Sequence, residues 1–144
     1  MKEYKHTQIG YLLIIALSAA TLLIAFLSLR TTNSGAIVLL AFMILCVGLF
    51  ATLTVKVNEQ AMDIRFGIGV IRKRFELKDI QIYRAVKNPW YYGWGIHLIP
   101  GGWIYNVSGW DAVELQMKNG SKFRIGTDDV QGLIDAISRY TRNV

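Results

Sequence analysis

The chain has 144 residues, 53% of them hydrophobic, with sixteen Lys and Arg against ten Asp and Glu and a formal net charge of +6. Residues 9–29 and 31–55 carry no charge, so the charged part is about 90 residues long, which is enough for one small domain and excludes two. The lone cysteine, Cys46, excludes an intrachain disulfide and a thiolate metal site.

The two uncharged runs predict two transmembrane helices. Residues 9–29 would form a helix about 31 Å long at ~1.5 Å per residue, which matches the thickness of a hydrocarbon core. Residues 36–55 would form the second span, with residues 1–8 before the hairpin and residues 30–35 as an external turn. A cleaved signal peptide is the competing interpretation, but the apolar run continues beyond the small residues at 18–20.

Basic residues predict the orientation of this hairpin. Lys2 and Lys5 precede the first run and only Arg30 lies between the two runs, whereas five bases follow within twenty residues of the second. The excess of positive charge on cytoplasmic segments therefore places both termini in the cytoplasm. We expect a multi-pass protein of the cell membrane, with the lipid bilayer as a partner.

Residues 53–144 predict a β-rich cytoplasmic domain. Apolar residues alternate with polar ones over 53–58 and again over 62–66, with a short polar turn between, which is the pattern of a hairpin with one buried face. Further strands are expected at residues 70–77 and from Ile80 onward.

The last part of the chain predicts a hairpin and a helix. Strands at 113–117 and 123–125 flank Asn119-Gly120, a pair typical of a two-residue type I′ turn. Thr127 or Asp128 is expected to cap the helix that follows, and the stripe at Val130, Leu133, Ile134 and Ile137 has helical spacing. We expect this helix to plug the open end of a curled sheet.

The stretch from Tyr91 to Ile137 resembles the bacterial pleckstrin-homology-like domains found behind one or two transmembrane helices, and the resemblance covers roughly residues 53–140. The resemblance lies in Tyr-Gly-x-Gly-Ile at Tyr92–Ile96, in Ser108-Gly109, in the strand ending at Asn119-Gly120, and in Thr127-Asp128-Asp129 before the helix. It implies an α+β fold in which a bent antiparallel sheet of about seven strands is capped by a C-terminal helix. It implies no catalytic residue.

A basic cluster is the first candidate binding site. Basic residues near an anionic leaflet contribute about 1 kcal/mol each, so this cluster is a candidate site for lipid headgroups. A solvated strand face is the alternative interpretation. The cluster consists of Arg72, Lys73, Arg74 and Lys78.

An aromatic cluster is the second candidate site. Its rings are too many for a small core to absorb fully, so some are expected at the bilayer interface or at a surface for a protein partner or a second copy. The alternative is that alternate rings fill the core. The candidate interface residues are Trp90, Tyr91, Tyr92, Trp94 and Trp103.

No catalytic, metal or cofactor motif stands out in the sequence. His97 with Asp111, or the adjacent pair Asp128 and Asp129, would be the centre of an enzyme acting on a membrane-associated substrate, which is the alternative function. A nucleic-acid-binding or peptide-binding OB-type barrel is disfavoured. In an OB fold the helix lies between strands three and four, whereas the predicted helix of this chain comes last. The sequence favours a non-enzymatic, membrane-anchored module that binds protein partners, itself or anionic lipid headgroups, and does not bind nucleic acid.

Overall fold

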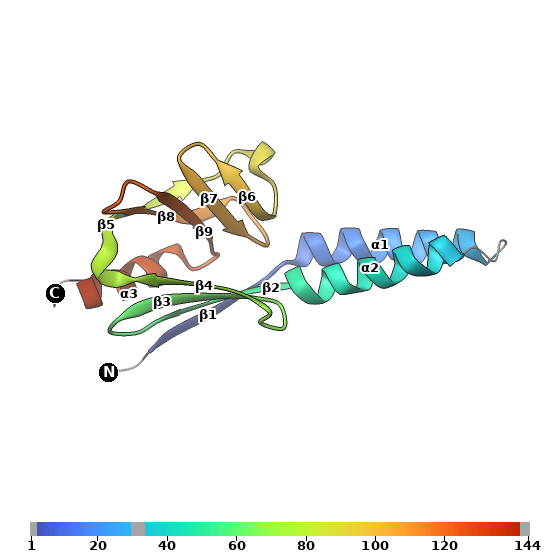
Figure 1. Ribbon diagram of the computed structural model, residues 1–144, viewed down its shortest axis with the longest axis horizontal. Helices are drawn as coiled ribbons and strands as arrows, with labels where there is room; N and C mark the ends of the chain where they lie inside the picture. The colour runs from blue at the N-terminus through green and yellow to red at the C-terminus, as the bar shows by residue number, and fades with distance from the viewer. Residues whose placement is uncertain (1–2, 30–33, 142–144) are drawn as a thin grey trace.

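The computed structural model describes residues 3–29 and 34–141 (Figure 1). Over these residues the chain is α+β, with three α-helices and nine strands. Lys2, Arg30 and most of the predicted turn at residues 30–35 lie outside the described residues, and the remainder of that turn, Ser34 and Gly35, belongs to a helix. The helices are α1 (Tyr11–Ser28), α2 (Ser34–Phe50) and α3 (Val130–Thr141), with short 3-10 helices η1 (Leu77–Asp79) and η2 (Trp90–Tyr92).

The strands form two sheets instead of the single sheet of about seven strands that was predicted. The first has the order β1-β2-β3-β4 and contains β1 (Tyr4–Ile9), β2 (Thr52–Val57), β3 (Ala61–Phe66) and β4 (Ile71–Glu76). The second has the order β5-β8-β9-β7-β6 and contains β5 (Ile80–Lys87), β6 (Gly95–Ile99), β7 (Gly102–Asn106), β8 (Asp111–Met117) and β9 (Lys122–Gly126). The prediction of a purely antiparallel sheet is wrong as well, because β9 lies parallel to β7.

The N-terminal strand β1 has no counterpart in the sequence prediction. It pairs antiparallel with β2, and Lys5 lies opposite Lys56 in the register. Gln8 is buried on the inner side, whereas Lys5 and Thr7 are exposed on the outer side. Because this strand ends at Ile9, the first apolar helix begins at Tyr11, two residues after the predicted start.

Helices α1 and α2 lie side by side and project away from the sheets (Figure 1). By length and composition, α1 is long and apolar enough to cross a membrane. With 17 residues, α2 is a shorter apolar helix, so the structure does not support the second of the two predicted spans on the same criterion. The reason is that Thr52 and the residues after it, which end the predicted run, belong to β2.

The connections between the sheet and the helices are very short. Gly10 alone separates β1 from α1, and Ala51 alone separates α2 from β2. The backbone N–H of Gly10 donates to the carbonyl of Ala51 over 2.8 Å, which joins the two connections. A Cβ atom at Gly10 would lie 2.9 Å from the carbonyl oxygen of Val107, so the close approach requires glycine.

The core lies between the two sheets, with α3 at one end of the space between them (Figure 1). The prediction that the last helix packs its apolar stripe against the sheets is confirmed for Leu133 and Ile137, which are fully buried. The predicted cap is wrong by one or two residues. Asp129 caps the helix, because its carboxylate accepts from the N–H of Gly132 and its carbonyl accepts from Leu133.

The hairpin of β8 and β9 forms as predicted, but its turn differs. Gly120 has a φ of +87°, and the described residues contain no non-glycine residue with positive φ, so Asn119 cannot belong to a type I′ turn. The N–H of Gly120 instead donates to the carbonyl of Met117, and the N–H of Ser121 to the Asn119 side chain. A longer loop with one left-handed glycine therefore joins the strands.

Candidate functional site

The structure divides the predicted basic cluster. Arg72 and Arg74 are exposed on the outer face of the four-stranded sheet, as the alternation along β4 requires. Lys73 faces the other way, with its Nζ 5.8 Å from the centroid of the Phe123 ring in the second sheet. Lys78 lies in η1, at the end of β4 that is remote from α1 and α2 (Figure 1). Only Arg72 and Arg74 therefore share one face.

A groove, called here the β4 groove, lies between the edge of the first sheet and the second sheet. Its volume is about 400 Å³. Its lining residues are Ile71, Arg72, Lys73, Ile96, Trp103, Tyr105 and Phe123. Strand β4 is the last strand of its sheet, so among the described residues its outer edge has no strand partner. An apolar floor beside an unpaired strand edge can accept an extended peptide.

Aromatic packing fixes the floor of the β4 groove. The rings of Phe75 and Phe123 pack edge to face with centroids 4.8 Å apart, and Tyr105 lies between the rings of Phe66 and Phe75. Burial raises the pKa of the Tyr105 hydroxyl. Trp103 is 40% exposed and lies at the rim. The groove therefore has a rigid apolar base and one large ring available to a partner.

The other predicted aromatic residues separate into two groups. Trp90 and Tyr91 are 78% and 66% exposed in η2, the yellow turn on the side of the domain from which the helices project (Figure 1). Tyr92 and Trp94 are partly buried, because Arg124 lies 5.4 Å from the Tyr92 ring and Trp94 packs on Trp110 at 5.8 Å. Of the five predicted residues only Trp103 lines the β4 groove.

A charge network beneath this segment was not predicted. The Glu114 carboxylate accepts from Arg84 at 2.6 Å and from Arg124 at 2.8 Å, and Arg124 also donates to the Asn88 side chain at 3.2 Å. Burial raises the pKa of Glu114, but the hydrogen bonds from the two guanidinium groups outweigh it and leave that pKa below the ordinary value. The network ties Asn88, just before η2, to the centre of the second sheet.

The residues considered for catalysis do not come together. His97 is on β6 and Asp111 on β8, with β7 and β9 between them, so the two strands lie about 14 Å apart at the usual strand spacing. His97 instead contacts the backbone carbonyl of Trp94 through Nε2. Within the described residues no group of three His, Cys, Asp or Glu side chains could hold a metal ion.

The Asp128 and Asp129 pair binds the N-terminal strand. His6 Nε2 lies 2.5 Å from the Asp128 carboxylate, and the Tyr4 hydroxyl donates to Asp129 over 3.0 Å. Burial, and then the bond and charge of Asp129, raise the pKa of the Tyr4 hydroxyl. These contacts were missed because more than 120 residues separate the partners. They hold β1 to the start of α3.

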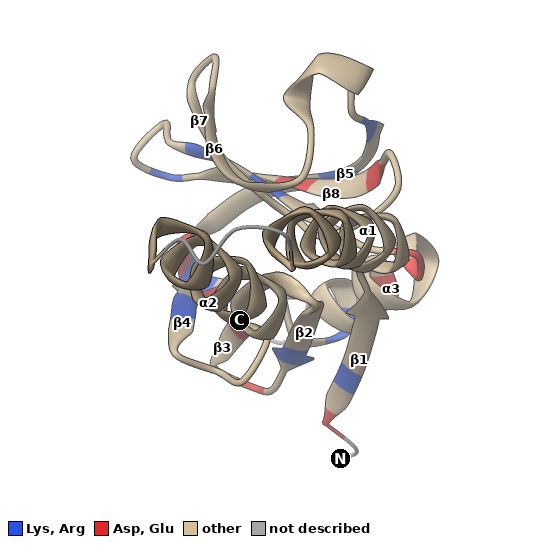
Figure 2. Cartoon of the chain, turned by 90° about the vertical axis from the view of Figure 1, so that its right-hand side faces the viewer, with Lys and Arg blue, Asp and Glu red and all other residues tan. Residues whose placement is uncertain are grey.

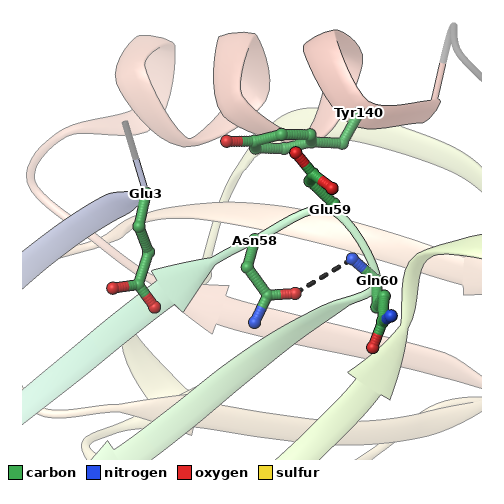
Figure 3. Close-up of a pocket in the computed structure, with 5 residues that line it drawn as sticks. All are labelled: Glu3, Asn58, Glu59, Gln60 and Tyr140. Carbon is green, nitrogen blue, oxygen red and sulfur yellow. Dashed lines mark hydrogen bonds between the residues drawn. The ribbon is translucent and has the colours of Figure 1, made fainter. Parts of the chain in front are cut away.

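A polar pocket lies at the turn between β2 and β3 (Figure 3). Its lining residues are Glu3, Asn58, Glu59, Gln60 and Tyr140. The Asn58 side chain accepts from the N–H groups of Gln60 and Ala61, both at 2.9 Å, which builds the turn. The Asn58 side chain, which lies at the centre of this pocket, thus has a structural role.

No protein-family model matches the chain, and neither the curated proteins nor the solved structures show a significant match. The function of the chain therefore has to be inferred from the β4 groove, the apolar helices and the distribution of charge.

Proposed function

We propose that the chain is a non-enzymatic interaction module of the cell membrane, anchored by α1 and α2 with both termini in the cytoplasm. Helix α1 is 18 residues long, and the 17 residues of α2 extend about 26 Å, close to the shortest lengths that span a bilayer. No side chain of either helix is buried. An exposed apolar surface of this extent needs lipid or a partner to cover it.

The domain that follows is proposed to be pleckstrin-homology-like. Two facing sheets with a C-terminal helix at one end of their core support this assignment, together with the sequence resemblance. The fold alone assigns no ligand, because such scaffolds serve many partners. The partner has to be inferred from a surface of this chain.

The β4 groove is the single observation that carries the proposed binding function. It combines an apolar cavity of about 400 Å³, a rim tryptophan and a free strand edge. We propose that it accepts an extended segment of a protein partner or of a second copy, with backbone bonds to β4 and an apolar side chain against Phe123. Lys73 at the same site favours an acidic residue in that segment.

Site-specific photocrosslinking in native membranes tests this proposal. A photoreactive amino acid at the position of Trp103 should give a discrete adduct with a partner or with a second copy. The matched control places the same group at Gln81, which is exposed on β5 at the opposite edge of the second sheet. Equal labelling from the two positions would show that the β4 groove is not the binding surface.

The membrane placement has its own test. The full chain should stay in the membrane pellet after alkaline carbonate extraction, and protease added outside intact cells should leave residues 52–141 uncut. Release by carbonate, or cleavage of the domain from outside, would contradict the proposed anchoring and orientation.

A further inference from the structure

The outer face of the four-stranded sheet carries two like-charged pairs. Lys5 lies directly opposite Lys56 on β1 and β2, and Arg65 lies opposite Arg72 on β3 and β4. Like charges in such positions destabilise a sheet. Glu3 lies 4.0 Å from Lys56, but no described carboxylate forms an ion pair with Arg65 or Arg72. Asp63 lies opposite Lys56 on its other side, so the excess of positive charge on this face is concentrated at Arg65 and Arg72.

The four cations surround one hollow of about 300 Å³. Its base includes Thr7 and Thr54, whose hydroxyl groups lie 2.9 Å apart. Among the described residues no Asp or Glu lines it. Arg72 uses its Nε to donate to the Gly69 carbonyl at 2.5 Å, which holds the guanidinium at the hollow. Guanidinium, ammonium and hydroxyl donors together are the set that binds phosphate oxygens.

The hollow lies beside the base of the apolar helices. The turn between β3 and β4 forms one wall, and it is held to α2 because the N–H of Ile68 donates to the Gly48 carbonyl over 3.3 Å. Ile68 and Val70 in this turn are 74% and 70% exposed. Figure 2, which looks along the helices, shows Lys and Arg on β1, β2 and β4 around that base. Cations and exposed apolar side chains are thus adjacent where the domain meets the helices.

We infer that this hollow binds the phosphate group of an anionic membrane lipid, with Ile68 and Val70 in the interfacial region of the same leaflet. The inference rests on the proposed membrane anchoring. A lipid is favoured over free phosphate because the hollow opens beside an apolar helix and next to exposed apolar side chains. Of the basic cluster predicted from the sequence only Arg72 takes part, and its partners Lys5, Lys56 and Arg65 come from three other strands.

Native mass spectrometry of the full chain in neutral detergent measures the affinity for added phosphatidylglycerol. The test variant is R65Q/R72Q, and the control is K78Q/K87Q, which removes the same charge at exposed positions outside the hollow. Each lost cation should weaken binding about fivefold, so the test variant should bind roughly 25-fold more weakly and the control should bind like the wild type. Phosphatidylcholine should bind the wild type and the test variant with the same affinity.

Thermal unfolding separates lost binding from lost folding. Without lipid, R65Q/R72Q should melt at or above the temperature of the wild type, because the repulsion between the two arginines is gone. Phosphatidylglycerol should raise the melting temperature of the wild type and of the control, and should leave that of the test variant unchanged. K5Q/K56Q, which removes the other two cations of the hollow, should likewise show no shift with phosphatidylglycerol.

Several outcomes would overturn the inference. The first is an equal loss of phosphatidylglycerol affinity in the test and control variants. The second is a wild type that binds phosphatidylcholine as tightly as phosphatidylglycerol. The third is a rise in the melting temperature of the wild type with inorganic phosphate equal to that with the same concentration of phosphatidylglycerol. Each of them leaves the anchoring and the β4 groove untouched. Release of the full chain by carbonate would instead reject the anchoring, and the lipid site with it.

Discussion

Replacing Glu114 with Gln would test how the segment carrying Trp90 and Tyr91 is held. The wild-type carboxylate accepts three hydrogen bonds from two guanidinium groups. The Arg84 side chain is 63% exposed, so its ion pair contributes at most about 1 kcal/mol. The side chains of Arg124 and Glu114 are only 17% and 6% exposed, and a charged hydrogen bond in such a place contributes about 1.5–3 kcal/mol. The expected loss of unfolding free energy is therefore about 2–3 kcal/mol.

Denaturant unfolding of the full chain in detergent, followed by tryptophan fluorescence, measures this loss. Glu59→Gln is the matched control, because Glu59 is exposed in the turn after β2 and should change stability by less than about 0.5 kcal/mol. Hydrogen exchange should also rise over residues 88–94 in the Glu114 variant. A loss for Glu114→Gln no larger than that of the control would refute the assignment of this network as the support of the aromatic segment.

The same carboxylate gives a pH dependence with a definite sign. The pKa of Glu114 in the folded chain lies below its ordinary value of 4.5, because the bonds from Arg84 and Arg124 outweigh the effect of burial. Its stabilising contribution is therefore present above about pH 4.5 and is lost as the pH falls through the folded-state pKa. The wild type should lose stability more steeply than Glu114→Gln in that acidic range.

Two further predictions concern the turns and the N-terminal strand. Gly67→Ala should lower the free energy of unfolding by at least about 2 kcal/mol, because φ at Gly67 is +47° and a Cβ would overlap backbone carbonyls of α2. Gly120→Ala should lower it by only about 1 kcal/mol, because φ at Gly120 is +87° but a Cβ there would meet open space. Equal losses in denaturant unfolding would contradict this reading of the α2 contact. Tyr4→Phe should cost about 1 kcal/mol at neutral pH through the lost bond to Asp129. Because the folded-state pKa of Tyr4 is raised, the stability of the wild type should fall as the pH rises above about 10. That fall should be absent in Tyr4→Phe. Parallel curves of stability against pH for the two proteins would contradict the assigned role of the bond between Tyr4 and Asp129.

The parts of the fold that were predicted correctly are those encoded by neighbouring residues. Leu53, Val55 and Val57 alternate with polar residues, and all three are buried on one face of β2. The stripe containing Leu133 and Ile137 has helical spacing and both side chains are buried in α3. In each case burial of one face dictates a local period that the sequence must display.

Strand β1 escaped prediction because its inner face is polar. Tyr4, His6 and Gln8 point inward, and their polar ends bond to Asp129, to Asp128 and to the carbonyl of Ser108. Without apolar alternation the segment has no strand signature. The strand pairs with β2, about 50 positions away, and its inward side chains bond to residues 100 or more positions away, and no local pattern contains either contact.

Neither binding surface was visible in the sequence for a similar reason. The β4 groove needs Ile71, Trp103 and Phe123 from three strands, and the parallel pairing of β7 with β9 that aligns Trp103 with Phe123 was not predicted. The phosphate hollow needs Lys5 opposite Lys56, which follows from the undetected β1. The run of bases at 72–74 indicates a charged site, but strand alternation separates its members: Lys73 lines the β4 groove alone, whereas Arg72 lines both the β4 groove and the hollow.

The short connections between sheet and helices have a mechanical consequence. Gly10 and Ala51 are single-residue links joined by a hydrogen bond, so a tilt of α1 or α2 cannot be absorbed by a flexible linker. Any such tilt must turn β1 and β2, and with them the hollow that carries Lys5 and Lys56. A lipid phosphate bound in the hollow would resist that rotation. Because β4 belongs to the same sheet, the bound phosphate would also fix the angle at which the β4 groove meets a partner. Lipid binding and partner binding are therefore expected to be coupled through the orientation of the first sheet.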